Sequence, residues 1–68
     1  MKSITDAFKE KNLKITPQRI AVFKYLKSTK EHPSAETIYK ALQPDFPTMS
    51  LATVYKALKT FVDVGLVQ

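Results

Sequence analysis

The sequence predicts a mainly α-helical domain of four short helices, and three observations support this fold class. Apolar residues recur at helical spacing in four segments of the 68-residue chain. A serine or threonine that can cap a helix N-terminus stands before each segment. Proline-containing breaks separate the last three segments, and the single glycine of the chain follows the fourth. The length allows one domain, residues 1–68, and the 44% hydrophobic content suits a folded chain.

The first two helices have clear start signals. Ser3 can cap the first helix, and Asn12 marks its expected frayed end. Thr16 is a good N-cap for the second helix, and Pro17 suits its first turn, where the missing N–H costs nothing. We place this second helix at about residues 17–29. The apolar residues of the first helix are Ile4, Ala7 and Phe8.

The third and fourth helices follow breaks that contain proline. Pro33 disfavours helix at the residue before it, and Ser34 can cap the third helix directly after it. Ser50 can cap a fourth helix at about residues 51–64, and Gly65 stands where a left-handed C-terminal glycine is common. The apolar stripe of the third helix consists of Ala35, Ile38, Tyr39 and Leu42. The apolar "LVQ" at the C-terminus could open a β-strand.

The fourth helix has two different faces. At 100° per residue, one face collects apolar residues and is expected to be core: Leu51, Val54, Leu58, Phe61 and Val62. The other face carries Thr53, Lys56, Thr60 and Asp63, flanked by Ala52 and Lys59, with Tyr55 at the boundary. Its first two turns hold no acid, so they could approach a DNA major groove. There Ala or Tyr can touch thymine methyl groups, and Thr, Ser or Lys can bind phosphates or base edges. The alternative is an ordinary amphipathic helix whose outer face is only solvated.

Two further features favour DNA as the partner. The third and fourth helices form a helix–turn–helix with a longer turn than usual, and the second helix of such a pair reads DNA. The formal net charge is +5, and residues 1–30 carry eight basic against two acidic side chains. A basic small domain suits a polyanion, although a solvated lysine-rich surface has the same composition. Together the features place DNA binding ahead of the solvated surface.

Other classes of function find less support. The chain lacks a nucleophile–base set, paired carboxylates and a glycine-rich phosphate loop, so we do not expect an enzyme. It has no cysteine, no membrane-length apolar run and no signal-peptide core, which makes a cytoplasmic location the default. A protein–protein module is the main alternative, and exposed apolar residues near Phe46, Met49 and Leu66 would favour it. A membrane-surface peptide is a weaker option, because the apolar face of the basic first helix is modest.

Four motifs stand out along the chain: "LKITPQR" at 13–19, "HPSAETIYKAL" at 32–42, "FPTMSLATVYKAL" at 46–58 and "GLV" at 65–67. In this order and spacing they resemble the N-terminal DNA-binding domain of the ferric uptake regulator (Fur) family, over residues 1–68. The wording is most similar to the peroxide-sensing PerR branch. The resemblance implies a winged helix–turn–helix with an extra N-terminal helix, a three-helix core and wing strands truncated after Gln68. It also implies a transcriptional repressor.

The resemblance also assigns DNA contacts. The residue matched by Tyr55 contacts base edges in the major groove, chiefly thymine, and the residue matched by Lys14 reaches an A·T-rich minor groove. Lys56 departs from the arginine of iron-sensing members and from the asparagine of peroxide-sensing ones. It keeps the charge of arginine but loses the bidentate fork. Four residues match positions that contact phosphates: Thr16, Arg19, Ser50 and Thr53. A surface salt bridge is the alternative role for Arg19.

The single histidine, His32, cannot form a metal site by itself in a chain without cysteine and with scattered acids. The resemblance implies that it is one ligand of a regulatory Fe²⁺ or Mn²⁺ site completed by a C-terminal metal-sensing and dimerisation domain that is absent here. The resemblance also implies that this C-terminal domain holds a structural Zn²⁺ in the full-length parent. We expect no cofactor in this chain, a homodimer on a palindromic A·T-rich operator for the parent, and a weakly binding monomer for the fragment.

Overall fold

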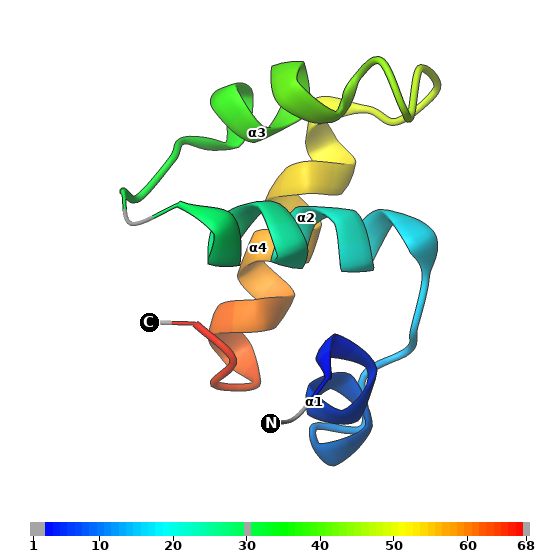
Figure 1. Cartoon of the computed structure of the whole chain (residues 1–68), viewed down its shortest axis with the longest axis vertical. Coiled ribbons are helices and arrows are strands. Elements are labelled where there is room, and N and C mark those ends of the chain that lie inside the picture. The colour runs from blue at the N-terminus through cyan, green and yellow to red at the C-terminus, as the bar shows by residue number, and fades with distance from the viewer. Residues whose placement is uncertain (1–2, 30, 68) are drawn as a thin grey trace.

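The computed structural model describes residues 3–29 and 31–67, and it contains four helices in this part of the chain. They are α1 (Ile4–Glu10), α2 (Pro17–Ser28), α3 (Ala35–Leu42) and α4 (Leu51–Asp63). Helix α2 packs against each of the other three, and α3 also packs against α4. Figure 1 shows α2 across the middle, with α3 above it, α4 crossing behind it and α1 below. The mainly α-helical fold predicted from the sequence is confirmed.

The N-termini of all four helices are capped as predicted. A side-chain hydroxyl accepts a hydrogen bond from the backbone N–H three residues later in each case, at 3.1–3.2 Å. The capping residues are Ser3, Thr16, Ser34 and Ser50. Each cap satisfies a backbone donor that has no partner inside its helix, which is typically worth about 1 kcal/mol. Local chemistry therefore sets where every helix begins.

Helices α1 and α4 end in the same hydrogen-bonded motif. A left-handed residue follows each of them, Asn12 with φ 56° and Gly65 with φ 83°. The amide of the next residue then reaches back to a phenylalanine carbonyl: Leu13 N–H to Phe8 O at 2.9 Å, and Leu66 N–H to Phe61 O at 2.8 Å. The prediction for Gly65 is confirmed. Asn12 lies just past the end of α1, as predicted, and the motif closes the helix there because asparagine tolerates the left-handed conformation.

Three phenylalanine rings join α1, α2 and α4. The ring centroids of Phe8 and Phe23 lie 5.6 Å apart, those of Phe8 and Phe61 5.6 Å, and those of Phe23 and Phe61 5.4 Å. The rings meet at tilted or edge-to-face angles, which the ring quadrupoles favour. Around this phenylalanine cluster (Phe8, Phe23 and Phe61) the core continues into α3 and its neighbours through Ala35, Ile38, Leu42, Met49, Val54 and Ala57.

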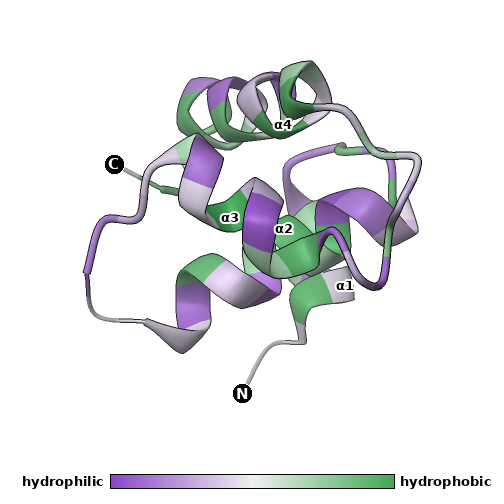
Figure 2. Ribbon diagram, turned by 90° about the horizontal axis from the view of Figure 1, so that it is seen from above, coloured by the Kyte–Doolittle hydropathy of each residue, from purple (hydrophilic) through white to green (hydrophobic). Residues whose placement is uncertain are grey.

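The structure corrects several details of the sequence prediction. Val62, expected in the core, is 52% exposed, whereas Ala57 is buried at 5%. The core-facing stripe of α4 consists of the buried positions 54, 57 and 61 and the half-buried position 58, so the residue after Phe61 turns outward. Helix α2 ends one residue earlier than predicted, at Ser28, and α4 ends at Asp63 instead of residue 64. Figure 2 shows the resulting bands of apolar and polar residues along α3 and α4.

The C-terminal segment after α4 adds no strand within the described ranges. Leu66 and Val67 are half-buried and pack against the core without strand pairing, so the strand that "LVQ" could open is not observed. Gln68, the last residue of that segment, lies outside the described residues. None of the helices in residues 3–29 and 31–67 is long and apolar enough to cross a membrane.

Candidate nucleic-acid interface

The segment before α2 and the first turns of α4 form two sides of one hollow of about 320 Å³. Five of the residues predicted to contact DNA line it: Lys14, Thr16, Arg19, Thr53 and Lys56. The other three, Ser50, Ala52 and Tyr55, lie at the N-terminal end of α4 and are exposed. The fold therefore brings residues 14–19 next to a helix that begins more than 30 residues later in the sequence.

On the α2 side, Arg19 ties the preceding loop to the helix. Its Nη1 donates a hydrogen bond to the Lys14 carbonyl at 3.0 Å, and its backbone N–H donates to Thr16 Oγ1 at 3.1 Å. The surface salt bridge considered for Arg19 is not present among the described residues, because its guanidinium partner is a neutral carbonyl. This hydrogen bond joins the guanidinium of Arg19 to the backbone of the loop before α2, and both Arg19 and Lys14 line the hollow.

On the α4 side, the capping hydroxyls define an open helix N-terminus. Ser50 Oγ accepts from the Thr53 N–H at 3.2 Å and lies 3.0 Å from Thr53 Oγ1. The first turn of α4 contains no acidic residue. A helix N-terminus carries a partial positive charge and unpaired N–H groups, both of which favour an anion such as phosphate.

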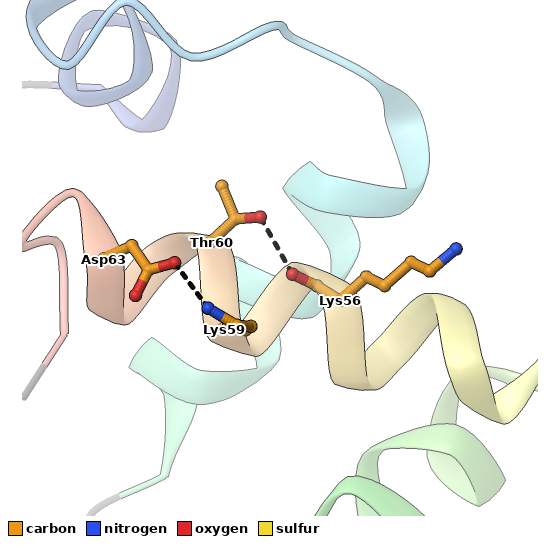
Figure 3. A network of polar contacts seen from close by, with 4 residues as sticks. All are labelled: Lys56, Lys59, Thr60 and Asp63. Atoms are coloured by element: carbon orange, nitrogen blue, oxygen red, sulfur yellow. Dashed lines mark hydrogen bonds and ion pairs between the residues drawn. The ribbon is translucent and has the colours of Figure 1, made fainter.

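The outer face of α4 separates its charges along the helix. Lys59 Nζ lies 3.0 Å from Asp63 Oδ2, an ion pair whose side chains are 77% and 60% exposed. Thr60 Oγ1 donates to the Lys56 carbonyl at 2.9 Å. Figure 3 shows the Lys56 side chain extending away from the Lys59–Asp63 pair. Its ammonium group makes no ion pair with another described residue, so the uncompensated charge of α4 lies in its N-terminal half.

Tyr55 stands out of α4 but is not free. Its side chain is 52% exposed, and its hydroxyl donates to Glu36 Oε1 on α3 at 2.5 Å. This hydrogen bond is the first cause that lowers the pKa of Glu36, followed by the Glu36 backbone N–H, the Ser34 hydroxyl and the charge of Lys40. The same carboxylate raises the pKa of the Tyr55 phenol. Each group therefore holds the other in its neutral-pH form, carboxylate and phenol.

Sequence reasoning missed two residues of this region. Glu36 stands in the first turn of α3, where an acid is favourable to the helix dipole, and its contact to a residue 19 positions later depends on how α3 crosses α4. Gln18 also lines the hollow beside Lys14 and Arg19. Its position in the first turn of α2, one residue before Arg19, was the signal that could have included it.

Comparison with known proteins decides the family. The model of the "Ferric uptake regulator family" matches residues 10–68, which is most of the chain. The chain belongs to the ferric uptake regulator family. The resemblance predicted from the sequence motifs is thereby confirmed, and the branch is supported by the relatives that follow.

Two curated relatives of this Fur-family chain illustrate the branch. The "Transcriptional regulator PerR" of Clostridium acetobutylicum is 75% identical over 68 residues, covering 100% of this chain and 49% of that protein. The "Peroxide-responsive repressor PerR" of Staphylococcus aureus strain Mu50 is 47% identical over 62 residues, covering 91% of this chain and 42% of that protein. These relatives are regulators and not enzymes, as predicted. The chain spans about half the length of the curated relatives it matches.

Solved structures of PerR proteins share the fold of this Fur-family chain. PerR from Streptococcus pyogenes, studied for peroxide sensing and gene regulation, superposes with a TM-score of 0.82 at 50% identity. The match covers 91% of this chain and 42% of that one. A GAS PerR in a form described as PerR-Zn-Zn gives 0.81 at 50% identity, with coverage of 91% and 40%. The helical arrangement is thus that of the N-terminal region of PerR.

His32 lies away from the candidate interface in this Fur-family fold. It is exposed in the loop before α3 and lines a separate hollow of about 520 Å³ with Glu31 and Leu66. Structural zinc sites use four ligands, and calcium sites use a larger number of oxygen ligands. No group of three or more His, Cys, Asp and Glu side chains gathers anywhere in residues 3–29 and 31–67.

Proposed function

We propose that this chain is the DNA-binding domain of a metal-dependent, PerR-type transcriptional repressor, and that α4 enters the major groove of an A·T-rich palindromic operator. One observation carries the proposal: residues 14–19 and the first turns of α4 line the same basic hollow. A duplex presents phosphates on both sides of its major groove, so a helix in the groove needs positive groups beside it. The names of the PerR relatives support the same conclusion.

The geometry supports separate roles for the residues, with some contacting phosphates and others contacting bases. Ser50, Thr53 and the open N-terminus of α4 bind one phosphate, while Thr16 and Arg19 at the start of α2 bind another. Ala52 and Tyr55 face the bases from the first two turns of α4. Two lysines remain: Lys56 contacts a guanine edge or a phosphate, and Lys14 enters the adjacent minor groove.

The complete repressor would contain two copies of this domain. A palindromic operator offers two half-sites related by two-fold symmetry, which two copies of α4 would match. Residues beyond those of this chain would supply the dimer contacts and the remaining ligands of a metal site to which His32 contributes one nitrogen. Iron or manganese would regulate DNA binding there, and a structural zinc would stabilise the same part. Such a repressor would act in the cytoplasm, where DNA is accessible.

The protein–protein alternative has less support. It required exposed apolar residues near Phe46, Met49 and Leu66. Met49 is only 3% exposed, and the other two are half-buried and pack against the core. The three apolar residues on which this alternative depended therefore do not form an exposed patch for a protein partner.

A titration of this chain into labelled duplexes tests the proposal. Fluorescence anisotropy compares an A·T-rich palindromic duplex with a scrambled duplex at low salt. We expect a preference for the palindrome that Tyr55→Ala abolishes, at a loss of about 1–3 kcal/mol of discrimination. Val62→Ala is the matched control, because Val62 is equally exposed on α4 but lies about 10 Å further along the helix axis.

The control also defines the contrary results. Equal loss of preference in Tyr55→Ala and Val62→Ala would mean that the first turns of α4 have no special role. Absence of binding to either duplex at low salt would overturn the DNA-binding proposal and favour a protein-contact module.

A further inference from the structure

Glu36 is the acidic residue whose side chain contacts the candidate base-reading helix from another element. Its Oε1 accepts a hydrogen bond from the Tyr55 hydroxyl, with 2.5 Å between the two oxygens, across the α3–α4 crossing. Glu36 stands in the first turn of α3, directly after the capping residue Ser34 and Ala35, so its backbone position is set by the start of that helix. Tyr55 is therefore fixed at both ends, by its Cβ on α4 and by its oxygen on α3.

This hydrogen bond limits what Tyr55 can offer to DNA. A phenol has a single proton for donating a hydrogen bond, and here it is donated to a carboxylate in a charge-assisted bond. Donating the same proton to thymine O4 or to a phosphate would break that bond and leave an exposed carboxylate facing DNA. The exposed part of Tyr55, about half of its surface, can still make apolar contact through the ring. Thymine is the base that presents a methyl group in the major groove.

We propose that Glu36 is a positioning residue, which holds the Tyr55 hydroxyl so that the Tyr55 ring covers a thymine methyl group and the hydroxyl donates no hydrogen bond to a base. The inference rests on the proposed function, since it specifies how the same helix face distinguishes bases. It also accounts for the position of an acid beside this interface, since the first turn of α4 itself contains no acidic residue. A negative charge there repels phosphate, so its position needs a compensating role.

Removing only the methyl groups of the DNA isolates this contact. Deoxyuridine pairs like thymine but lacks the C5-methyl group, so we compare the palindromic duplex with its deoxyuridine counterpart. For the unaltered chain we expect tighter binding to the thymine duplex, by about fourfold for each methyl group covered. Glu36→Ala should abolish most of this thymine preference because the ring loses its fixed orientation.

A conservative variant separates orientation from charge. The side-chain oxygen of Glu36→Gln can still accept the Tyr55 proton, but the negative charge is gone. We expect Glu36→Gln to keep the thymine preference and to bind both duplexes more tightly. Glu31→Gln is the charge control, since Glu31 is exposed before α3 and lies with His32 at a separate hollow. Circular dichroism should show native helix content for Glu36→Ala, Glu36→Gln and Glu31→Gln, because both glutamates are exposed.

The combination with Tyr55→Phe gives a second, independent comparison. If Glu36 acts through the hydroxyl, then Glu36→Ala, Tyr55→Phe and the double variant should show the same reduced thymine preference, a non-additive result. The inference is overturned if Glu36→Ala keeps the preference, or if it tightens binding to thymine while Tyr55→Phe weakens it. Failure of the unaltered chain to bind either duplex would instead overturn the proposed function, and the role of Glu36 with it.

Discussion

At the scale of single residues, Tyr55 and Glu36 change each other's proton affinity, which solution measurements can detect. The carboxylate raises the pKa of the Tyr55 phenol above its ordinary value, and the phenol lowers the pKa of Glu36. We expect NMR titration of Tyr55 to give an elevated pKa that returns to the ordinary tyrosine value in Glu36→Ala. An unchanged Tyr55 titration in that variant would show that the hydrogen bond does not persist in solution.

The directions of these shifts define the pH range in which the link stabilises the fold. The Glu36 pKa is lowered, so its contribution is complete above the unfolded carboxyl pKa and is lost as pH falls through the lowered value. The Tyr55 pKa is raised, so its contribution is complete below the unfolded phenol pKa and is lost as pH rises through the raised value. Since both groups are exposed, the effect on orientation should exceed the effect on stability.

Residue identity alone predicted part of this chemistry. The helical wheel placed Tyr55 at the boundary of α4, and it is half-exposed there. The partner Glu36 was not predictable, because the hydrogen bond requires the crossing geometry of α3 and α4. Arg19 shows the same limit, since its bond to the Lys14 carbonyl follows from the path of the loop before α2.

At the scale of the helices, we expect the left-handed conformation of Gly65 to stabilise the C-terminal end of α4. A Cβ at this position would make an ordinary van der Waals contact with Lys11 Nζ at 3.9 Å, so any cost of substitution comes from the backbone. At φ 83° we expect Gly65→Ala to lower the free energy of unfolding by about 1–2 kcal/mol, measured by urea denaturation.

An asparagine substitution provides the control for that prediction. Asn12 already adopts the left-handed conformation at the equivalent position after α1. Gly65→Asn should therefore lose less stability than Gly65→Ala. If the two variants unfold at the same urea concentration, the left-handed backbone is not the cause.

The helices were the most predictable level of this structure, for local reasons. Hydroxyl caps and prolines lie within a few residues of the helix ends that they determine, so all four starts could be read from the sequence. The errors arose where neighbouring elements decide. Val62 is apolar and lies beside the predicted stripe, but α2 and α3 cover only the side of α4 that contains Val54 and Phe61.

At the scale of the whole molecule, the distribution of charge predicts the salt dependence of DNA binding. We expect Lys56→Ala to weaken binding on all sequences and to reduce the slope of log K against log salt by about 1. Lys24→Ala removes the same charge from a different hollow, between α2 and the end of α3. Its slope should stay unchanged. Equal reductions in the two variants would indicate that only net charge matters.

The placement of the interface could be predicted only in part at this scale. The basic excess of residues 1–30 and the acid-free start of α4 pointed to a common ligand. That residues 14–19 lie beside Lys56 and Thr53 depends on the packing of α2 against α4, which no local signal contains. The family resemblance supplied the list of residues, and the fold supplied their proximity.

The phenylalanine cluster helps to set the orientation of α4. Phe61 and Val54 are both fully buried, and they hold the helix at two points about 10 Å apart along its axis. If a change of ring volume in the cluster displaced Phe61 by about 1 Å, the axis of α4 would tilt by about 6°. Tyr55 is next to the other fixed point, so such a tilt rotates its ring. Substitutions in α1, far from any base, can thus alter the angular precision of recognition while the domain stays folded.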